Sequence, residues 1–432
     1  MIDIQLVREN PKLVSEKAVQ KGYPVDINRL LSLDNERKEL LGQVESIRQR
    51  RNENAEKIKG VGQPDQALID EGKLIKIELN ERETYLTSIE AEYTHLLKKV
   101  PNMPLDDVPV GASEDDNQVV MEWGDKPQFE FEPKNHAGLA EARGWLDKEH
   151  AAKVSGSRFA YIKGDLVKLQ FALINWITDV LTDTVKIREI AEQAGLEVDH
   201  RPFTPVLPPL MLKTGVFEAM DRLEPADDRY KIEGEELWLQ GSAEHVLGPI
   251  HAGETFLQAD LPVRYLGFAT SFRKEAGTYG KDMEGIIRMH QFDKLEMESF
   301  TTPEDGLKEH LLLIAIQEYI LQQLKLPYRK VMKCTYDIGK PNARGVDMDV
   351  WLPGQGKYRE THTADYMTDF QSRRLKTKVR RGDDLCLVHT NDATGLALGR
   401  GMVGILENYQ TADGYVRIPD VLRGYLGGRE QL

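Results

Sequence analysis

The strongest signal in the sequence is carried by Thr270-Ser-Phe-Arg-Lys-Glu275 and, after a short loop, by Arg288-Met-His-Gln-Phe292. Both segments read as strands of one hairpin, and the loop at residues 276–282 is Gly-rich and polar, as in a loop that closes over a ligand. Arginine grips phosphate or carboxylate in a planar, bidentate way, and a ring such as Phe292 stacks on a base. The pattern therefore favours a ligand-binding hairpin. For Arg273 and Glu275 taken alone, the alternative is a surface hairpin with ordinary ion pairs.

The length and the composition of the chain limit the class of protein that we expect. The chain has 432 residues, enough for two or three domains, and its 40% apolar and 30% charged residues are typical of a soluble globular protein. No apolar run approaches the roughly 20 residues that a membrane span needs. No signal-peptide pattern opens the chain, so Met1-Ile-Asp-Ile-Gln reads as the mature start. We expect a cytoplasmic protein with no membrane partner.

The two cysteines and the net charge limit which metal sites, disulfides and nucleic-acid partners we expect. Cys334 and Cys386 have no CxxC spacing and no nearby histidine pair, so neither zinc nor a disulfide framework is expected. The 57 basic and 71 acidic residues give a net charge of −14, which argues against a nonspecific nucleic-acid binder. A local basic stripe that grips RNA stays compatible with that charge.

The first hundred residues predict a helical hairpin. After a short helical lead-in over residues 1–27, with Asn10-Pro11 as a helix start, apolar residues recur every three or four positions. In the first run they are Leu30, Leu33, Leu40, Val44, Ile47 and Ile58. A turn-rich break at residues 60–65 precedes the second run, a coiled-coil seam of Leu68, Gly72, Ile75, Leu79, Arg82, Leu86, Ile89, Tyr93, Leu96 and Val100. Two such helices form an antiparallel hairpin over about residues 28–100, with a length of roughly 50 Å.

After an acidic, Pro-containing linker, the rest of the chain contains both predicted helices and predicted strands. The expected elements are a helix over 166–194, strands over 264–270 and 285–289, and a helix over 303–324. Strands gathered around few long helices, without regular βαβ alternation, favour an antiparallel α+β domain over a doubly wound sheet. The predicted domains are therefore residues 1–110, which contain the hairpin, and residues 111–432.

Two further segments carry a weaker signal. Gly395-Leu-Ala-Leu-Gly399-Arg400 reads as a glycine turn at a strand edge that feeds a helix, where Arg400 can face a polyphosphate. Taken alone this pattern is common before helices. Phe203-Thr-Pro-Val-Leu-Pro-Pro209 reads as an edge strand, because proline cannot donate to a sheet ladder.

Together these segments resemble the class II aminoacyl-tRNA synthetases. The hairpin of the opening paragraph resembles motif 2 of that family, the glycine turn resembles motif 3, and Phe203–Pro209 resembles motif 1. The run His290-Gln-Phe-Asp-Lys-Leu-Glu296 is similar to the seryl branch. The resemblance extends from Met1 to about Tyr409 and includes the helical hairpin.

Three segments match the seryl pattern with changes. Gly241-Ser242-Ala-Glu244 stands where the family has Thr-x-Glu, Glu360-Thr-His-Thr363 where it has Glu-Ile-Ser-Ser, and Asn391-Asp-Ala-Thr394-Gly395 where it has Asn-Gly-Ser-Gly. Ser242 and Thr394 each retain a hydroxyl, so the pocket is expected to retain its chemistry, while its stringency against threonine stays open. Glu296 would accept the substrate's hydroxyl, a contact that rejects alanine.

The resemblance implies a set of ligands for each substrate. For serine they are Ser242, Ala243, Glu244, Arg273, Glu296 and Thr394. For ATP they are Arg273, Lys274, Glu275, Met289, Phe292, Glu360, Thr361, His362, Thr363 and Arg400, with Glu360 also holding Mg²⁺. The implied catalytic residues are Arg273, Glu275 and Arg400. The implied tRNA contacts are Arg48, Arg50, Arg51 and Lys57, although each of these taken singly also fits a solvated helix face.

The resemblance also implies a homodimer, built on motif 1, and a two-step reaction. ATP and L-serine would form seryl-adenylate, and the seryl group would then pass to tRNA(Ser); charging of tRNA(Sec) stays open. One alternative is a synthetase-like ligase that loads a carrier protein, which would not need the heptads at 68–100. Another is a catalytically silent coiled-coil interaction protein, and the presence of Arg273, Glu275 and Arg400 counts against it.

Overall fold

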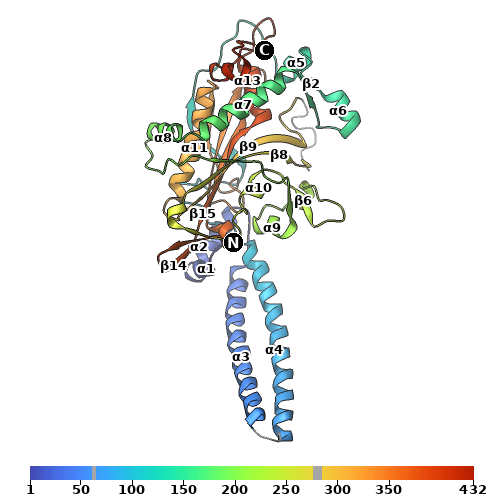
Figure 1. The fold of residues 1–432 in the computed structure, drawn as a ribbon, viewed down its shortest axis with the longest axis vertical. Helices are drawn as coiled ribbons and strands as arrows, with labels where there is room; N and C mark the ends of the chain where they lie inside the picture. Colours follow the sequence, from blue (N-terminus) through green and yellow to red (C-terminus); the bar gives the residue numbers. More distant parts are fainter. Residues whose placement is uncertain (61–64, 276–284) are drawn as a thin grey trace. The chain divides into compact units, whose positions relative to one another are not determined.

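The computed structural model describes residues 1–60, 65–275 and 285–432 and forms two units, Met1–Met103 and Pro104–Leu432 (Figure 1). The ligand loop expected at residues 276–282 lies outside the described residues, as does most of the expected break at 60–65. Within the described ranges, no helix combines the length and the apolar character that crossing a membrane requires.

The N-terminal unit is a long antiparallel helical hairpin preceded by two short helices. The short helices are α1 (Ile4–Glu9) and α2 (Pro11–Gln20), and α2 begins at a proline as predicted. The hairpin, called the arm below, consists of α3 (Ile27–Gly60) and α4 (Gln66–Lys99), which have 34 residues each. At 1.5 Å per residue, each helix is about 51 Å long, which confirms the expected coiled-coil arm.

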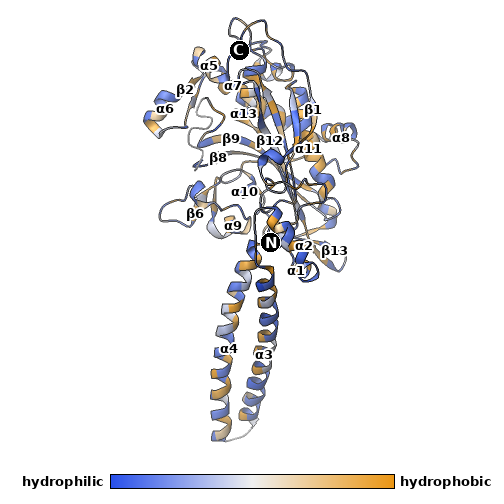
Figure 2. Cartoon of the chain, turned by 180° about the vertical axis from the view of Figure 1, so that it is seen from behind, coloured by the Kyte–Doolittle hydropathy of each residue, from blue (hydrophilic) through white to orange (hydrophobic). Residues whose placement is uncertain are grey.

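Apolar side chains between α3 and α4 hold the arm together, and Figure 2 shows them interspersed with polar residues along both helices. The buried ones are Leu30, Leu33, Leu40, Val44 and Ile47 on α3, and Ile75, Leu79, Leu86, Ile89, Tyr93 and Leu97 on α4. Two expected members were wrong, because Arg82 is exposed and Leu97 is buried in place of Leu96. The periodicity also missed Asn54, a buried amide whose Nδ2 donates to the Leu68 carbonyl at 3.2 Å.

The C-terminal unit is built on an eight-stranded sheet in the order β1-β10-β11-β12-β15-β9-β8-β4. In chain order its strands are β1 (Gln118–Trp123), β4 (Thr204–Val206), β8 (Val263–Phe272), β9 (Gln291–Thr301), β10 (Tyr328–Met332), β11 (Arg344–Leu352), β12 (Lys357–Thr368) and β15 (His389–Ala397). Every neighbouring pair is antiparallel except β4 with β8, which confirms the antiparallel α+β class. The Pro-containing β4 lies at one edge of the sheet, as its sequence predicts.

Smaller elements flank this sheet. The helices are α5 (His136–Ala142), α6 (Lys148–Ser155), α8 (Thr184–Gln193), α9 (Thr214–Ala219), α10 (Glu244–Leu247), α12 (Phe370–Leu375) and α14 (Asp420–Arg423). The short strands are β2 (Leu146–Asp147), β3 (Tyr161–Ile162), β5 (Met211–Lys213), β6 (Leu237–Leu239), β7 (Thr255–Leu257), β13 (Lys378–Arg381) and β14 (Asp384–Leu387).

Two expected elements were wrong. The single helix predicted over 166–194 is two helices, α7 (Asp165–Leu181) and α8, because the Asp183 carboxylate accepts from the Val185 amide at 2.8 Å and so starts a new helix. The strand predicted over 285–289 is a series of turns, with Gly285 at a φ of +62°. As a result, Arg273 and Arg288 lie just beyond the ends of β8 and β9 rather than on them.

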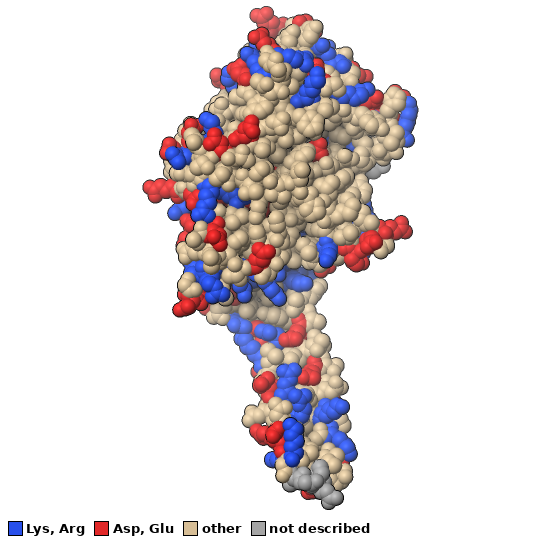
Figure 3. All heavy atoms as spheres, viewed as in Figure 1, with Lys and Arg blue, Asp and Glu red and all other residues tan. Residues whose placement is uncertain are grey.

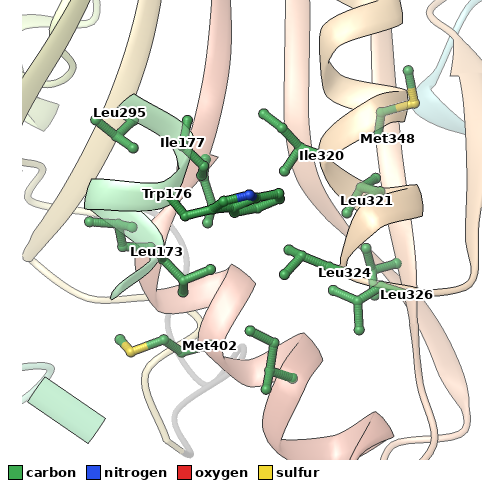
Figure 4. Packing of buried hydrophobic residues seen from close by; sticks show 14 of the residues in the cluster. Leu173, Trp176, Ile177, Leu295, Ile320, Leu321, Leu324, Leu326, Met348 and Met402 are labelled. Atoms are coloured by element: carbon green, nitrogen blue, oxygen red, sulfur yellow. The ribbon is translucent and has the colours of Figure 1, made fainter. Parts of the chain in front are cut away.

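Three helices cover one face of the sheet: α7, α11 (Gly306–Gln323) and α13 (Leu398–Asn408). Figure 4 shows side chains from α7, α11 and α13 meeting those of β9 and β11 in one apolar core, with Trp176 and Leu295 among them. Because successive strand residues point to opposite faces, Leu295 enters this core while Lys294 and Glu296 face the other side of the sheet. That side carries the candidate site.

Candidate active site

A cavity of about 800 Å³ lies on the sheet face opposite the helical core. Its strand residues alternate with core residues: Thr363 and Thr394 line the cavity, while Ala364 and Ala393 belong to the core. Most of its lining is charged. The sequence-predicted residues that line it are Glu244, Arg273, Glu275, Met289, Phe292, Glu360, Thr361, Thr363, Thr394 and Arg400.

Arg273 is one of these lining residues. Its Nε donates to the carbonyl of Gly241 at 2.8 Å, and its guanidinium carbon lies 5.3 Å from the centroid of the Phe292 ring. Its own backbone amide donates to the His290 carbonyl at 3.0 Å, which ties the end of β8 to the start of β9. Beside it, Arg288 donates to Glu275 Oε2 at 2.7 Å. The hairpin thus presents one arginine that is held from two sides.

Arg400 and Glu360 form a second charged group in the cavity lining. Arg400, in the first turn of α13, donates to the Glu360 backbone carbonyl at 2.8 Å, and its Nη1 lies 3.0 Å from Glu360 Oε1. Burial pushes the pKa of Glu360 upward, but the charges of Arg400, Lys333 and Arg273 outweigh burial, so that pKa lies below its usual value. Glu360 is therefore ionised at neutral pH, and an ionised carboxylate is a group that can bind Mg²⁺.

Buried carboxyls gather in another part of the site, around Glu244 and Glu296, which is called the carboxylate end below. Glu244 begins α10, Glu296 lies on β9, and Thr394 of β15 stands directly opposite Glu296 in the sheet register. Lys294 forms an ion pair with Glu296 Oε2 and also donates to Ser242 Oγ at 3.1 Å. Polar groups held this closely, and taken out of water, suit a small zwitterionic ligand.

The two carboxyls at this end differ in their charge state. Burial, together with the nearby Glu244 and Asp392 carboxylates, raises the pKa of Glu296 to about 8, although Lys294 opposes the shift. For Glu244 burial acts in the same direction, but the charges of Lys294 and Arg222 outweigh it and lower its pKa. The end of the cavity therefore offers one firmly ionised acceptor and one whose charge depends on its neighbours.

Five expected ligands do not line the cavity. Glu296 is buried just behind the lining, paired with Lys294 and opposite Thr394 in the sheet. Ser242 is fully buried and contacts the lining through Lys294, while Ala243 packs into a small apolar cluster. The Lys274 ammonium lies 5.5 Å from the Tyr230 ring centroid. His362 is buried, bonded through Nδ1 to Thr361 Oγ1 at 2.8 Å, and burial lowers its pKa to about 3.

Sequence reasoning missed many charged residues of the site, among them Lys294, Arg222 and Asp392. Lys294 could have been found, because it stands two positions before Glu296 on the same strand face. Arg222 and Asp392, whose side chains meet at 3.0 Å on the cavity wall, come from segments far apart in the chain. A pattern of local spacing carries no signal for that pair.

The predicted tRNA contacts lie on the arm, in the other unit. Arg48 donates to Glu83 at 2.8 Å and Arg50 to Glu78 at 3.1 Å, while Arg51 and Lys57 are exposed on the same helix. Figure 3 shows basic and acidic side chains interspersed along the arm surface.

Comparison with known proteins gives the same assignment for both units. Residues 1–104 match the seryl-tRNA synthetase N-terminal domain, and residues 229–409 match the tRNA synthetase class II core domain (G, H, P, S and T). The serine–tRNA ligase of Thermodesulfovibrio yellowstonii is 38% identical over 99% of both chains, and that of Nitrosopumilus maritimus is 35% identical over 100% of both.

Solved structures extend the similarity to the whole fold. The crystal structure of seryl-tRNA synthetase from Pyrococcus horikoshii complexed with ATP has a TM-score of 0.88 and 36% identity, covering 100% of this chain and 99% of that one. The cytoplasmic serine–tRNA ligase from Naegleria fowleri in complex with AMP has a TM-score of 0.84 and 27% identity, covering 100% of this chain and 98% of that one. The chain therefore belongs to the seryl-tRNA synthetases, the class II aminoacyl-tRNA synthetases that use ATP to join serine to tRNA.

Proposed function

We propose that this cavity forms seryl-adenylate, with serine at the end lined by Glu244 and Thr394 and ATP toward Arg400. The observation that carries the assignment is that Arg273 lines the same cavity as Glu244 and Arg400, and that its charge acts on both Lys294 and Glu360. Arg273 contacts Gly241, next to the carboxylate end, and its guanidinium lies against the ring of Phe292. One guanidinium there can hold both the serine carboxylate and the α-phosphate, because its fork matches either anion.

The reaction needs no nucleophile from the protein. A carboxylate oxygen of serine attacks the α-phosphorus of ATP, the bond from that phosphorus to the bridging oxygen breaks, and pyrophosphate leaves. Catalysis then rests on positioning and on neutralising the charge of the phosphates. Arg273 would hold the α-phosphate and Arg400 the phosphates further along.

At the amino-acid end, each carboxyl has a partner on serine. Glu244, which is ionised, would accept from the ammonium, and Glu296 from the side-chain hydroxyl, with the Thr394 hydroxyl beside it. Ser242 and Ala243 form the wall behind them. Alanine would leave the Glu296 carboxyl unpaired in a buried site, and such a loss is costly.

At the nucleotide end, adenine would stack on Phe292, with the Met289 backbone and Glu275 at its edge. Thr361 and Thr363 line the same cavity near Glu360.

Glu360 would hold Mg²⁺ together with the phosphates of ATP, and that cation supplies further charge neutralisation. The described residues include no group of three His, Cys, Asp or Glu side chains that could hold a metal alone, so the phosphates are needed as ligands. The side chains of Lys274 and His362 take no part in this proposal.

The arm would carry the RNA contacts of the second step, through Arg48, Arg50, Arg51 and Lys57 of the N-terminal domain, residues 1–110. The ion pairs of Arg48 and Arg50 are exposed, and exposed pairs contribute little, so both arginines can exchange them for phosphates. We also propose a cytoplasmic homodimer that pairs through the edge of the sheet at β4.

The first test is amino-acid-dependent ATP–pyrophosphate exchange with each of the twenty amino acids, in Mg²⁺ and without tRNA. Exchange with serine alone is expected, and Arg273→Ala should abolish it. Exchange with a different amino acid would overturn the assigned pocket, and no exchange at all would favour a silent interaction protein.

A second test separates the arm from the catalytic unit. Replacing residues 35–98 with a short Gly-Ser turn should spare serine-dependent exchange and abolish charging of tRNA(Ser). Unchanged charging by this variant would refute the role given to the arm. The same assay with tRNA(Sec) on the full chain decides whether that tRNA is a substrate as well.

A further inference from the structure

Lys294 has no role in the function proposed so far, yet it is buried at the centre of the amino-acid end of the cavity. Its ammonium pairs with Glu296 Oε2 and donates to Ser242 Oγ at 3.1 Å. Ser242 Oγ in turn lies 3.5 Å from the same Glu296 oxygen. One oxygen of the Glu296 carboxylate is therefore held from two directions.

The other oxygen of this carboxylate is left over. Glu296 Oε1 is buried and has no hydrogen-bond partner among the residues that the structure describes, and the same holds for Glu244 Oε2. A buried acceptor without a donor is costly, so each of these two atoms is a place where a ligand donor would restore a lost bond. Serine brings two kinds of donor, its ammonium and its hydroxyl.

The surroundings of Glu296 make a cation necessary. Glu244, Glu298 and Asp392 are buried carboxyls close enough to act on its charge, and burial raises the pKa of Glu296 even with Lys294 beside it. Without the Lys294 ammonium, this rise would be larger and Oε2 would lose its ion pair, so the carboxyl would be free to rotate and Oε1 would no longer be a fixed acceptor.

We propose that Lys294 is a positioning residue: it holds Glu296 Oε2 so that Oε1 receives the serine hydroxyl, and it thereby sets the preference for serine over alanine. The inference rests on the proposed function, because it assumes that Glu296 meets the hydroxyl. It adds a residue whose effect should appear in the choice of amino acid and not in the handling of ATP.

The test compares exchange kinetics with serine and with alanine in Lys294→Met, which keeps the length of the side chain and removes its charge. We expect kcat/KM for serine to fall by about a hundredfold and that for alanine by less than about fivefold, because alanine makes no hydroxyl contact to lose. The KM for ATP should stay unchanged. Lys294→Arg, which keeps a cation, should recover most of the serine preference.

Lys330→Met is the matched control. Lys330 on β10 pairs with Glu318 on α11 at 3.0 Å and does not line the cavity, so this variant also breaks a part-buried lysine–glutamate pair that involves a strand of the same sheet. It should leave the serine-to-alanine ratio as in the unaltered protein. A smaller drop in that ratio is expected for Ser242→Ala, which removes only the second partner of Lys294 and keeps its charge.

Two results would overturn the inference. In the first, serine and alanine lose kcat/KM in equal proportion in Lys294→Met while the KM for ATP holds, which would make Lys294 a general packing residue. In the second, which decides the matter when Lys294→Met is too unstable to assay, Ser242→Ala keeps the full serine preference. Absence of serine-dependent exchange in the unaltered protein would instead refute the proposed function itself.

Discussion

Gly285 allows a sharp test of how the nucleotide end of the site is built. It begins the run of turns that leads to Arg288 and Met289, at a φ of +62°. A Cβ at this position would lie 1.8 Å from His136 Nε2. His136 cannot easily retreat, because its Nδ1 lies 2.9 Å from Glu407 Oε1 and its backbone amide donates to the same oxygen at 3.1 Å.

In Gly285→Ala, the backbone of the nucleotide end must therefore move. A left-handed φ costs an alanine about 1–2 kcal/mol, and relieving the contact with His136 requires a displacement of more than about 1 Å. A misplacement of about 1 Å near reacting groups can lower a rate by about a hundredfold. We expect kcat/KM for ATP in serine-dependent exchange to fall by about that factor, and the free energy of unfolding to fall by about 2 kcal/mol or more.

Two variants separate backbone strain from the steric clash. Gly144 has nearly the same φ, +64°, but a Cβ added there would have no atom within 4 Å, so Gly144→Ala should lose stability without losing activity toward ATP. Adding His136→Ala to Gly285→Ala removes the clash and should restore part of the lost activity. The reasoning is refuted if Gly285→Ala retains normal ATP kinetics or if Gly144→Ala impairs them equally.

Two further predictions concern stability. Arg429, in the C-terminal tail, hydrogen-bonds to Asp165 and lowers the pKa of that carboxyl from 3.8 to about 2. The ionised Asp165 therefore stabilises the fold above pH 3.8, and this stabilisation disappears as the pH falls through 2. Asp165→Asn should therefore lower the melting temperature at pH 6 and have no effect below pH 2; an equal loss at both would contradict this. On the arm, Gly72→Ala should gain up to about 1 kcal/mol of helix propensity, but its Cβ would lie 3.0 Å from Asn54 Oδ1. The full gain should appear only when Gly72→Ala is combined with Asn54→Ala. If the changes in urea-unfolding free energy of the two single variants add up to that of the double variant, the two positions are not coupled and the prediction is contradicted.

The arm shows what hydrophobic periodicity can and cannot predict. The three-or-four spacing was sufficient to identify both helices, because a long amphipathic run has few other ways to bury its apolar face. It could not choose between Leu96 and Leu97 after Tyr93, since a step of three and a step of four both reach a leucine. It also could not place Asn54 in the interior, because a polar residue there breaks the very pattern that defines the seam.

At the site, the structure brings predicted residues into one cavity where they are neighbours in the sequence. The hairpin around Arg273 and the turn before Arg400 each combine several functional groups within a short stretch, and the fold keeps them together. Arg222 and Asp392 were out of reach, because only the tertiary fold brings α9's flanking loop against β15. The separation of Arg222 and Asp392 in the sequence follows neither a helix period nor a strand period.

The segment around Glu360 shows why adjacency in the sequence misleads within a strand. Along β12, Glu360 stands opposite Asp349 and Thr363 opposite Asp347, and all four line the cavity. Residues three apart in a regular strand face opposite sides, so a one-residue bulge is needed between Glu360 and Thr363. The register of β11 and β12 shifts at this point, leaving Thr361 as the extra residue.

That bulge also explains the place of His362. The residue pairs with Met348, whose side chain belongs to the helical core, so His362 faces the core although both of its neighbours line the cavity. A carboxylate and a hydroxyl are brought to one face at the expense of burying an imidazole on the other, and burial keeps that imidazole neutral. The bulge thus shapes the cavity, since a regular strand would present either Glu360 or Thr363 to it, and never both.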